Sequence, residues 1–167
     1  MSRLVAVYDA CVLYSASMRN YLMYLAKSRL FAAKWSADIH EEWMRSVERD
    51  FPDVTRDKLE RTRRLMDQHI DRALVQGYEP LIPALVLPDP DDRHVLAVAI
   101  HAQASAIVTF NGKDFPPEAL APHGVEAITP DELSVRLISE NEEMVLAAVR
   151  EHRASLKKPP MTAEQYL

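Results

Sequence analysis

The sequence predicts an α/β fold built on a mostly parallel sheet, and two observations lead to this prediction. Short apolar runs at residues 3–9, 105–110 and 125–129 alternate with longer segments of helical periodicity. Runs that are apolar along their whole length are typical of parallel strands, which helices cover on both faces. The 167 residues are 48% hydrophobic, which is enough for one domain with a buried core.

The helices and connections follow from periodicity, caps and prolines. Ile39, Trp43 and Val47 form an apolar seam on one helix, which Pro52 ends, and Thr55 is placed to cap the next helix. The prolines between residues 74 and 90 predict an ordered connection, with a short strand at 85–87. The other predicted helices span residues 18–31, 38–49, 92–104, 130–138 and 141–155, and a short strand spans 31–35.

Composition excludes several functional classes. Cys11 is the single cysteine, so neither an intramolecular disulfide nor a cysteine-based zinc cluster can form. None of the 3 glycines opens a phosphate-binding loop, and residues 40–44 lack the second histidine of a zinc-protease helix. The N-terminus has the pattern of neither a signal peptide nor a membrane-spanning helix. We therefore expect a cytoplasmic enzyme or binding domain without membrane contact.

The charges argue against a protein that simply coats nucleic acid. The formal net charge of −5 lacks the basic footprint that such a protein needs. Between residues 55 and 73, however, arginines and a lysine stand among several acids. Two interpretations remain open for this segment. It is either a solvated helix face with mixed ion pairs, which we favour, or a rim that steers phosphate groups.

Four separate stretches supply carboxylates. In a parallel sheet, ligands bind in the crevice beyond the carboxyl ends of the strands, where Asp9 and residues 109–114 are expected. Hard divalent cations such as Mg²⁺ take oxygen ligands, and two of them about 3.5–4 Å apart can clamp an in-line phosphodiester displacement. The sequence therefore offers the side chains of a nuclease-like metal site. The stretches are residue 9 and residues 41–42, 89–92 and 111–114.

Each acid also has a structural explanation. Asp89 can cap the helix that Pro90 begins, and Asp38 with Glu41 has the spacing of a capping box. Glu42 lies at the border of the apolar seam, which makes it the better ligand candidate of the glutamate pair. Asp9 is the hardest to explain structurally, because an acid that ends a buried strand must be paired, solvated or metal-bound.

The remaining polar and aromatic candidates have structural interpretations that we favour. His94 and His101 are seven residues apart on one helix face, where packing or a solvated edge is more common than a ligand role. Cys11 is expected to be a small buried residue. Trp35 and Trp43 are expected in the core, although either could stack on a base.

Taken together, the motifs resemble those of the PIN-domain family. Four segments occur in the family's order and spacing, with its four acidic motifs, and the similarity spans residues 4–129. The segments are VYDACVLY at 7–14, WSADIHEEW at 35–43, LPDPDDRHVLAVA at 87–99 and IVTFNGKDFP at 107–116.

The resemblance implies a three-layer α/β/α domain at residues 1–130. Residues 131–167 lie outside the matched motifs, and we expect them to form a C-terminal helical extension packed on or continuing the same domain. It also implies an Mg²⁺- or Mn²⁺-dependent endoribonuclease of the kind that serves as the toxin in VapBC-type toxin–antitoxin pairs. The implied metal-binding and catalytic acids are Asp9, Glu42, Asp92 and Asp114, with Asp89 as an auxiliary acid and Thr109 orienting water or a ligand.

One departure from the family's pattern concerns the second metal. Asn111 stands where an acid is common, so one negative charge is lost, although an amide oxygen can still bind Mg²⁺. Cys11 likewise stands where an asparagine is common. The departure at Asn111 favours an alternative hypothesis, a catalytically inactive PIN-fold module that binds RNA or a protein.

The resemblance also implies partners. RNA would be the substrate, a small antitoxin would cover the acidic crevice with an inserted arginine, and homodimers would form. A third hypothesis, an aspartyl-phosphate hydrolase with Asp9 as nucleophile, is disfavoured because Cys11 stands where that class has a second acid.

Overall fold

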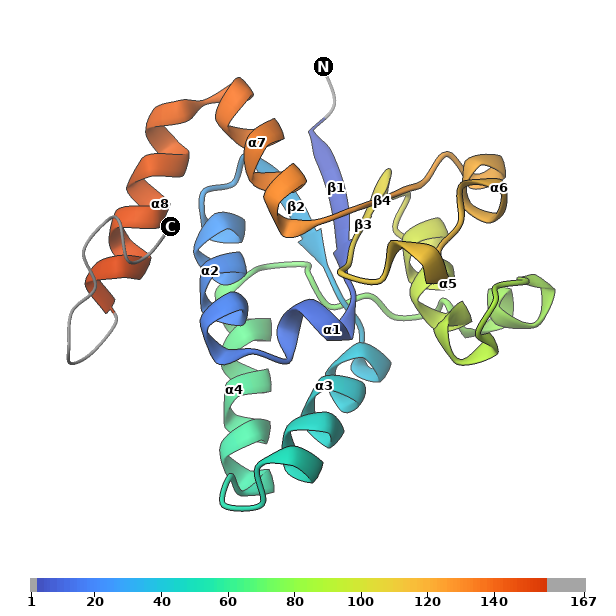
Figure 1. Cartoon of the computed structure of the whole chain (residues 1–167), viewed down its shortest axis with the longest axis horizontal. Helices are drawn as coiled ribbons and strands as arrows, with labels where there is room; N and C mark the ends of the chain where they lie inside the picture. The colour runs from blue at the N-terminus through green and yellow to red at the C-terminus, as the bar shows by residue number, and fades with distance from the viewer. Residues whose placement is uncertain (1–2, 156–167) are drawn as a thin grey trace.

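The computed structural model describes residues 3–155, and its centre is a four-stranded, wholly parallel sheet. The strands lie in the order β2-β1-β3-β4 (Figure 1). The predicted α/β class is therefore confirmed, as are the predicted strands at residues 3–9, 31–35, 105–110 and 125–129. The strands are β1 (Leu4–Tyr8), β2 (Phe31–Lys34), β3 (Ala106–Val108) and β4 (Glu126–Ile128).

Helices cover both faces of this sheet, which gives the three layers of an α/β/α domain. Helices α2 and α7 lie on one side of the sheet and α5 lies on the other, while α3 and α4 extend beyond its carboxyl edge (Figure 1). The longer helices are α2 (Ala16–Lys27), α3 (Ala37–Asp50), α4 (Arg56–His69), α5 (Arg93–His101), α7 (Pro130–Glu140) and α8 (Glu142–Ser155). Short helical turns are α1 (Ala10–Leu13), α6 (Pro117–Leu120), η1 (Glu79–Ala84), η2 (Pro90–Asp92), η3 (Gly112–Asp114) and η4 (Ala121–His123).

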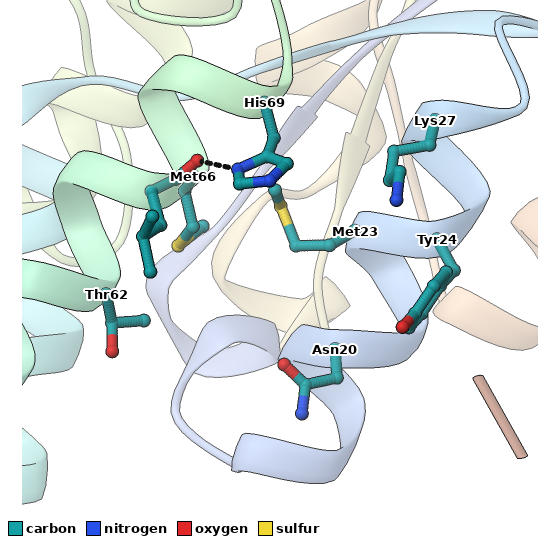
Figure 2. A pocket seen from close by; sticks show the side chains of 8 residues that line it. Asn20, Met23, Tyr24, Lys27, Thr62, Met66 and His69 are labelled. Carbon is teal, nitrogen blue, oxygen red and sulfur yellow. Dashed lines mark hydrogen bonds between the residues drawn. The ribbon is translucent and has the colours of Figure 1, made fainter. Parts of the chain in front are cut away.

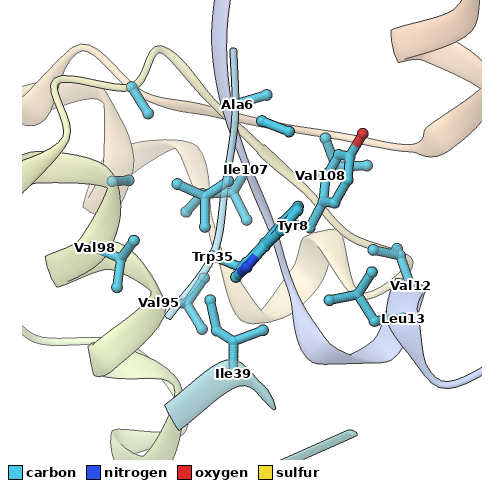
Figure 3. Packing of buried hydrophobic residues seen from close by; sticks show 14 of the residues in the cluster. Ala6, Tyr8, Val12, Leu13, Trp35, Ile39, Val95, Val98, Ile107 and Val108 are labelled. Atoms are coloured by element: carbon cyan, nitrogen blue, oxygen red, sulfur yellow. The ribbon is translucent and has the colours of Figure 1, made fainter. Parts of the chain in front are cut away.

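The core lies between the central strands and the helices on either side. Tyr8 of β1 stacks on Trp35 with ring centroids 6.0 Å apart, and both side chains are fully buried. Ile39 from α3 and Val95 and Val98 from α5 point toward this pair (Figure 3). Full burial of each of these aliphatic side chains stabilises the fold by about 1.5–3 kcal/mol. The expected core position of Trp35 is confirmed, as is that of Trp43, which is also fully buried.

A buried polar network ties α3, α4 and the end of β2 together. Trp35 Nε1 and His40 Nε2 both lie within hydrogen-bond distance of Asp67 Oδ1, at 2.7 and 2.9 Å. Trp43 Nε1 donates to His40 Nδ1 at 3.0 Å. Because an indole nitrogen can only donate, His40 Nδ1 must accept, so the proton of the neutral ring is on Nε2 and points to Asp67. Burial lowers the pKa of His40 despite the neighbouring carboxylate, in keeping with a neutral ring.

Some local predictions were wrong, and tertiary contacts explain why. Ser36, not Asp38, caps α3, because Ser36 Oγ accepts from the Ile39 amide at 3.2 Å. Asp38 instead accepts a hydrogen bond of 2.5 Å from the Tyr78 hydroxyl, so the predicted capping box with Glu41 does not form. Residues 85–87 form no strand, and the extra backbone pairing is a bridge between Trp35 and Leu74.

Three cations of the charged segment that follows Thr55, Arg56, Arg63 and Arg72, form ion pairs with acids. Thr55 caps α4 as predicted, and Arg56 forms ion pairs with Glu41, Glu48 and Glu60. Mixed ion pairs on a helix surface are what the favoured interpretation of this segment expects. Glu41 of α3 thus forms an ion pair with the first residue of α4.

Two further findings concern the chain as a whole. No helix within residues 3–155 is long and apolar enough to cross a membrane. The predicted C-terminal extension at 131–167 begins with α7 and α8, and its last residues, 156–167, lie outside the described part of the chain.

Candidate active site

The order of the strands places a topological switch point between β1 and β3. The chain moves from β1 outward to β2, then returns to the other side of β1 and continues through β3 to β4. The connections on the two sides of the β1–β3 boundary therefore lead away from each other, and ligands of open α/β sheets bind at such a switch point. Asp9 and Thr109 directly follow these two strands.

Asp9 is held rigidly at this point. Its Oδ1 accepts a hydrogen bond of 2.8 Å from the Ala10 amide as the N-cap of α1, and its Oδ2 accepts one of 2.9 Å from the Thr109 hydroxyl. The residue is only 5% exposed. Burial raises the pKa of Asp9 and the charge of Glu42 adds to this, while the hydrogen bonds from Thr109, Cys11 and Ala10 oppose it. Asp9 is thus a pre-positioned carboxylate at the end of a buried strand.

Cys11 has a polar role, contrary to the expectation of a simple buried residue. Its Sγ lies 3.4 Å from Asp9 Oδ2 and 3.3 Å from Thr109 Oγ1, and it accepts a hydrogen bond of 3.3 Å from the Phe110 amide. Burial and the charge of Asp9 raise the pKa of the thiol to about 11, so it acts as a neutral group. The sulfur therefore links the ends of β1 and β3.

Asp92 lies at the junction of η2 and α5 and faces several other carboxylates. Burial, followed by the charges of Asp9, Asp89, Glu42 and Asp114, raises the pKa of Asp92 to about 7. Four stretches that are far apart in the sequence therefore approach the same point in the fold. A carboxyl whose pKa is raised by burial and by several approaching carboxylates is typical of a functional site.

Glu42 of α3 lies near enough to the acidic crevice formed by Asp9, Asp92 and Asp114 for its charge to act on Asp9 and Asp92, and its carboxylate contacts His94. The Glu42 Oε1 and His94 Nε2 atoms are 2.5 Å apart. Burial acts to lower the pKa of His94, but the hydrogen bond and charge of Glu42 outweigh it and the pKa is raised. Sequence reasoning favoured only a packing or solvated role for His94. Its position two residues after Asp92, at the start of the same helix, was the available signal.

The remaining predicted residues occupy the rim of the crevice. Asp89 caps η2, because its Oδ1 accepts a hydrogen bond of 2.9 Å from the backbone amide of Asp91, and the capping interpretation is confirmed. The charge of Asp89 also acts on Asp92. Asn111 precedes η3, and its backbone amide donates a hydrogen bond of 3.0 Å to Thr109 Oγ1. Asp114 ends η3.

The chemistry of these side chains fits a divalent cation. Asp9, Asp92 and Asp114 supply hard carboxylate oxygens, and the pKa of Asp92 is raised by burial and then by the charges of its acidic neighbours. In residues 3–155, however, no three acid, histidine or cysteine side chains stand close enough to enclose an ion as they are now oriented. Glu42 is turned toward His94. Closing the site around an ion would therefore require side-chain rotation.

Two hollows on the surface of residues 3–155 lie away from these acids. One, of about 290 Å³, lies between α2 and α4, where Met23 and Tyr24 face Met66 and His69 (Figure 2). A second, of about 430 Å³, lies beside η1 and α5 and includes Leu81. Neither contains any of the predicted acids, so the acidic crevice is identified by its chemistry rather than by its depth.

The protein is an α/β/α domain with acidic residues gathered at the switch point of its parallel sheet, and sequence comparisons show to which family of such domains it belongs. The PIN domain profile matches residues 5–113, more than half of the chain, so this chain belongs to the PIN-domain family. A second profile, the VapC50 C-terminal domain, matches residues 130–167.

A relative has a more specific name. The chain is 36% identical over 95 residues to a protein of Mycobacterium tuberculosis (strain ATCC 25618 / H37Rv) named "Putative ribonuclease VapC50". The match covers 57% of this chain and 56% of the relative, so it spans little more than half of either protein.

Proposed function

We propose that this protein is an Mg²⁺- or Mn²⁺-dependent endoribonuclease that acts as the toxin of a toxin–antitoxin pair. The observation that carries the proposal is the convergence of Asp9, Glu42 and Asp114 on Asp92, whose pKa is raised to about 7 by burial and then by the charges of these neighbours. Membership of the PIN-domain family and the name of the mycobacterial relative support the same activity.

The proposed roles of the residues follow from how each is held. Asp9, fixed by the Ala10 amide and the Thr109 hydroxyl, and Asp92, at the start of α5, would hold the cation, joined by Glu42 and Asp114. A divalent cation bound there supplies the polarisation of water and the neutralisation of phosphate charge. Thr109 keeps Asp9 oriented, and Asp89 adds negative charge at the rim.

The direct test is cleavage of a labelled mixed RNA pool in the presence of Mn²⁺. We expect products that disappear with EDTA and in the Asp9→Asn variant, whose amide oxygen can still accept the hydrogen bond that caps α1. Asp91→Asn is the matched control, because Asp91 is exposed and is not among the groups that act on Asp92. Cleavage that persists in Asp9→Asn would contradict the proposal.

A catalytically inactive module that binds RNA or a protein is the second candidate. It is favoured by Asn111, which leaves this crevice one carboxylate short of the family's pattern, and by the absence of an enclosed three-ligand cluster in residues 3–155. Calorimetry with Mn²⁺ separates the two functions. Heat of binding that is lost in Asp9→Asn supports the nuclease, and no heat supports the inactive module.

The proposed toxin role includes partners. A small antitoxin would cover the acidic crevice, and an inserted arginine would satisfy Asp92 and Asp9 by paired hydrogen bonds. We also propose a homodimer. Copurification of the product of the neighbouring gene tests the first partner, and a monomeric mass at micromolar concentration would contradict the second.

A further inference from the structure

The loop between β3 and η3 exposes an aromatic ring directly beside the acidic crevice. Phe110 is 54% exposed, whereas Phe31 and Phe115 are at most 2% exposed. Isolated apolar residues on a surface are ordinary. Phe110 differs because it immediately follows Thr109, whose hydroxyl is bonded to Asp9. Since consecutive Cα atoms are about 3.8 Å apart, the Phe110 side chain leaves the backbone next to the residue that binds Asp9.

The backbone that carries this ring is fixed to the site on both sides. The Phe110 amide donates to Cys11 Sγ at 3.3 Å, and the Asn111 amide donates to Thr109 Oγ1 at 3.0 Å. The Asp114 amide then donates to the Asn111 carbonyl at 2.9 Å and closes the turn. The loop therefore holds Phe110 outside the core, and the two side chains that hold the loop, those of Cys11 and Thr109, also contact Asp9.

The same loop presents groups that complement a nucleic acid strand. Lys113 is exposed and forms no ion pair within residues 3–155. Gly112 has open space around its Cα, so nothing crowds an approaching ligand. An aromatic face with a nearby cation is the arrangement that binds single-stranded nucleic acid, through base stacking and phosphate contact.

Phe51 offers a comparison within the same chain. It is 52% exposed, but its ring is 6.2 Å from that of Tyr14, at the far end of α3. No ring contact of Phe110 is found in the described residues. Phe51 and Phe110 are therefore similarly exposed, but only Phe110 lies beside the acids. An effect of RNA on position 110 that is absent at position 51 would be specific to the site.

We propose that Phe110 stacks on a base of single-stranded RNA next to the phosphate at the acidic crevice, and that Lys113 contacts the RNA backbone. The proposal rests on the proposed ribonuclease function, because it assumes that the crevice receives RNA. It assigns to residues 110–113 the task of aligning the strand, separate from the task of the acids.

The test uses tryptophan as a reporter in the full chain. Phe110→Trp is placed in an Asp9→Asn background with Mn²⁺, so that a single-stranded oligoribonucleotide carrying a fluorescent end label stays intact. Trp35 and Trp43 are fully buried, so an exposed new indole is distinguished by its emission at longer wavelength. We expect RNA to quench the indole introduced by Phe110→Trp, while the indole introduced by Phe51→Trp in the same background is not quenched.

Activity gives a second, independent readout. In the otherwise unchanged protein, Phe110→Ala should raise KM for RNA by about 5- to 150-fold with kcat nearly unchanged, and Phe110→Tyr should restore KM. Lys113→Gln should reduce the slope of the logarithm of the RNA-binding constant against the logarithm of the salt concentration by about one. Lys58→Gln, on α4, should leave this slope unchanged.

The outcomes separate this inference from the proposed function. RNA that binds, by anisotropy of its label, and quenches the Phe110→Trp reporter but is never cleaved by the unchanged protein contradicts the nuclease and supports the stacking site. Cleavage with no quenching of that reporter, or with equal quenching of the Phe51→Trp reporter, overturns the stacking site alone. Absence of RNA binding overturns the inference, whatever metal the protein binds.

Discussion

The hydroxyl of Thr109 donates a 2.9 Å hydrogen bond to Asp9, although the two residues are 100 positions apart in the chain. The bond joins the ends of β1 and β3 at the switch point of the sheet. It therefore couples the carboxylate that β1 presents to the loop that carries Asn111 and Asp114.

Removal of the Thr109 hydroxyl should damage the site more than the fold. Thr109→Val keeps the shape but removes the donor to Asp9 and the acceptor of the Asn111 amide. We expect Mn²⁺ affinity, measured by calorimetry, to fall about 10–100-fold, as for other residues that orient a metal ligand. The free energy of unfolding should fall by about 1–3 kcal/mol. Thr109→Ser should restore most of both, and a Thr109→Ser protein as impaired as Thr109→Val would contradict this role.

Asp92 should make the metal-free protein less stable as the pH rises. Its pKa is raised to about 7 in the folded protein, against about 3.9 for a model aspartate, so the folded state binds more protons between these values. The stabilisation from protonated Asp92 is therefore complete below about pH 4 and is lost as the pH rises through about 7. Asp92→Asn should raise Tm at about pH 8 relative to the unchanged protein, and much less at about pH 4.

Differential scanning calorimetry in EDTA tests this pH dependence, with Asp91→Asn as the exposed control. Mn²⁺ should remove the difference at the higher pH by stabilising only the protein that retains Asp92. An equal change in Tm at both pH values would show that Asp92 acts as a structural residue rather than as a crowded charge.

Asp67 should be a major support of α4. Asp67→Ala would leave Trp35 Nε1 and His40 Nε2 without their shared acceptor, and both donors belong to fully buried residues. We expect the free energy of unfolding, from urea titration, to fall by about 2–5 kcal/mol. Asp71→Ala is the matched control, because the Asp71 side chain is 96% exposed and should change stability by less than about 0.5 kcal/mol.

Gln103 offers a stabilising substitution away from the site. It follows the end of α5 with φ at 56°, and the next amide, that of Ala104, donates 2.8 Å to the Ala99 carbonyl. This left-handed position usually holds glycine, because other residues are strained there. Gln103→Gly should raise the free energy of unfolding by about 0.5–1 kcal/mol in urea titration. Gln103→Ala keeps the strain, so a similar gain in that variant would contradict the explanation.

Most of the fold could be predicted because its signals are local. The strands at Leu4–Tyr8 and Ala106–Val108 are short apolar runs, and the α4 cap at Thr55 depends on a side chain three residues from the amide whose hydrogen bond it accepts. The α3 cap was misplaced for the opposite reason. Asp38 is a good cap by type, but Tyr78, 40 residues away, binds its carboxylate, and Ser36 takes the cap instead.

The sequence by itself determined the alternating strands and helices and the set of acids, because periodicity and residue chemistry are properties of neighbouring positions. Only the tertiary structure decided which of these acids meet. It brings Glu42 and His94 together across 52 positions and turns Cys11 toward Asp9 and Thr109. It also leaves Phe110 outside the core while the similar side chain of Phe115 is buried. These contacts depend on strand order and helix packing, which join distant segments and leave no periodic signal in the chain.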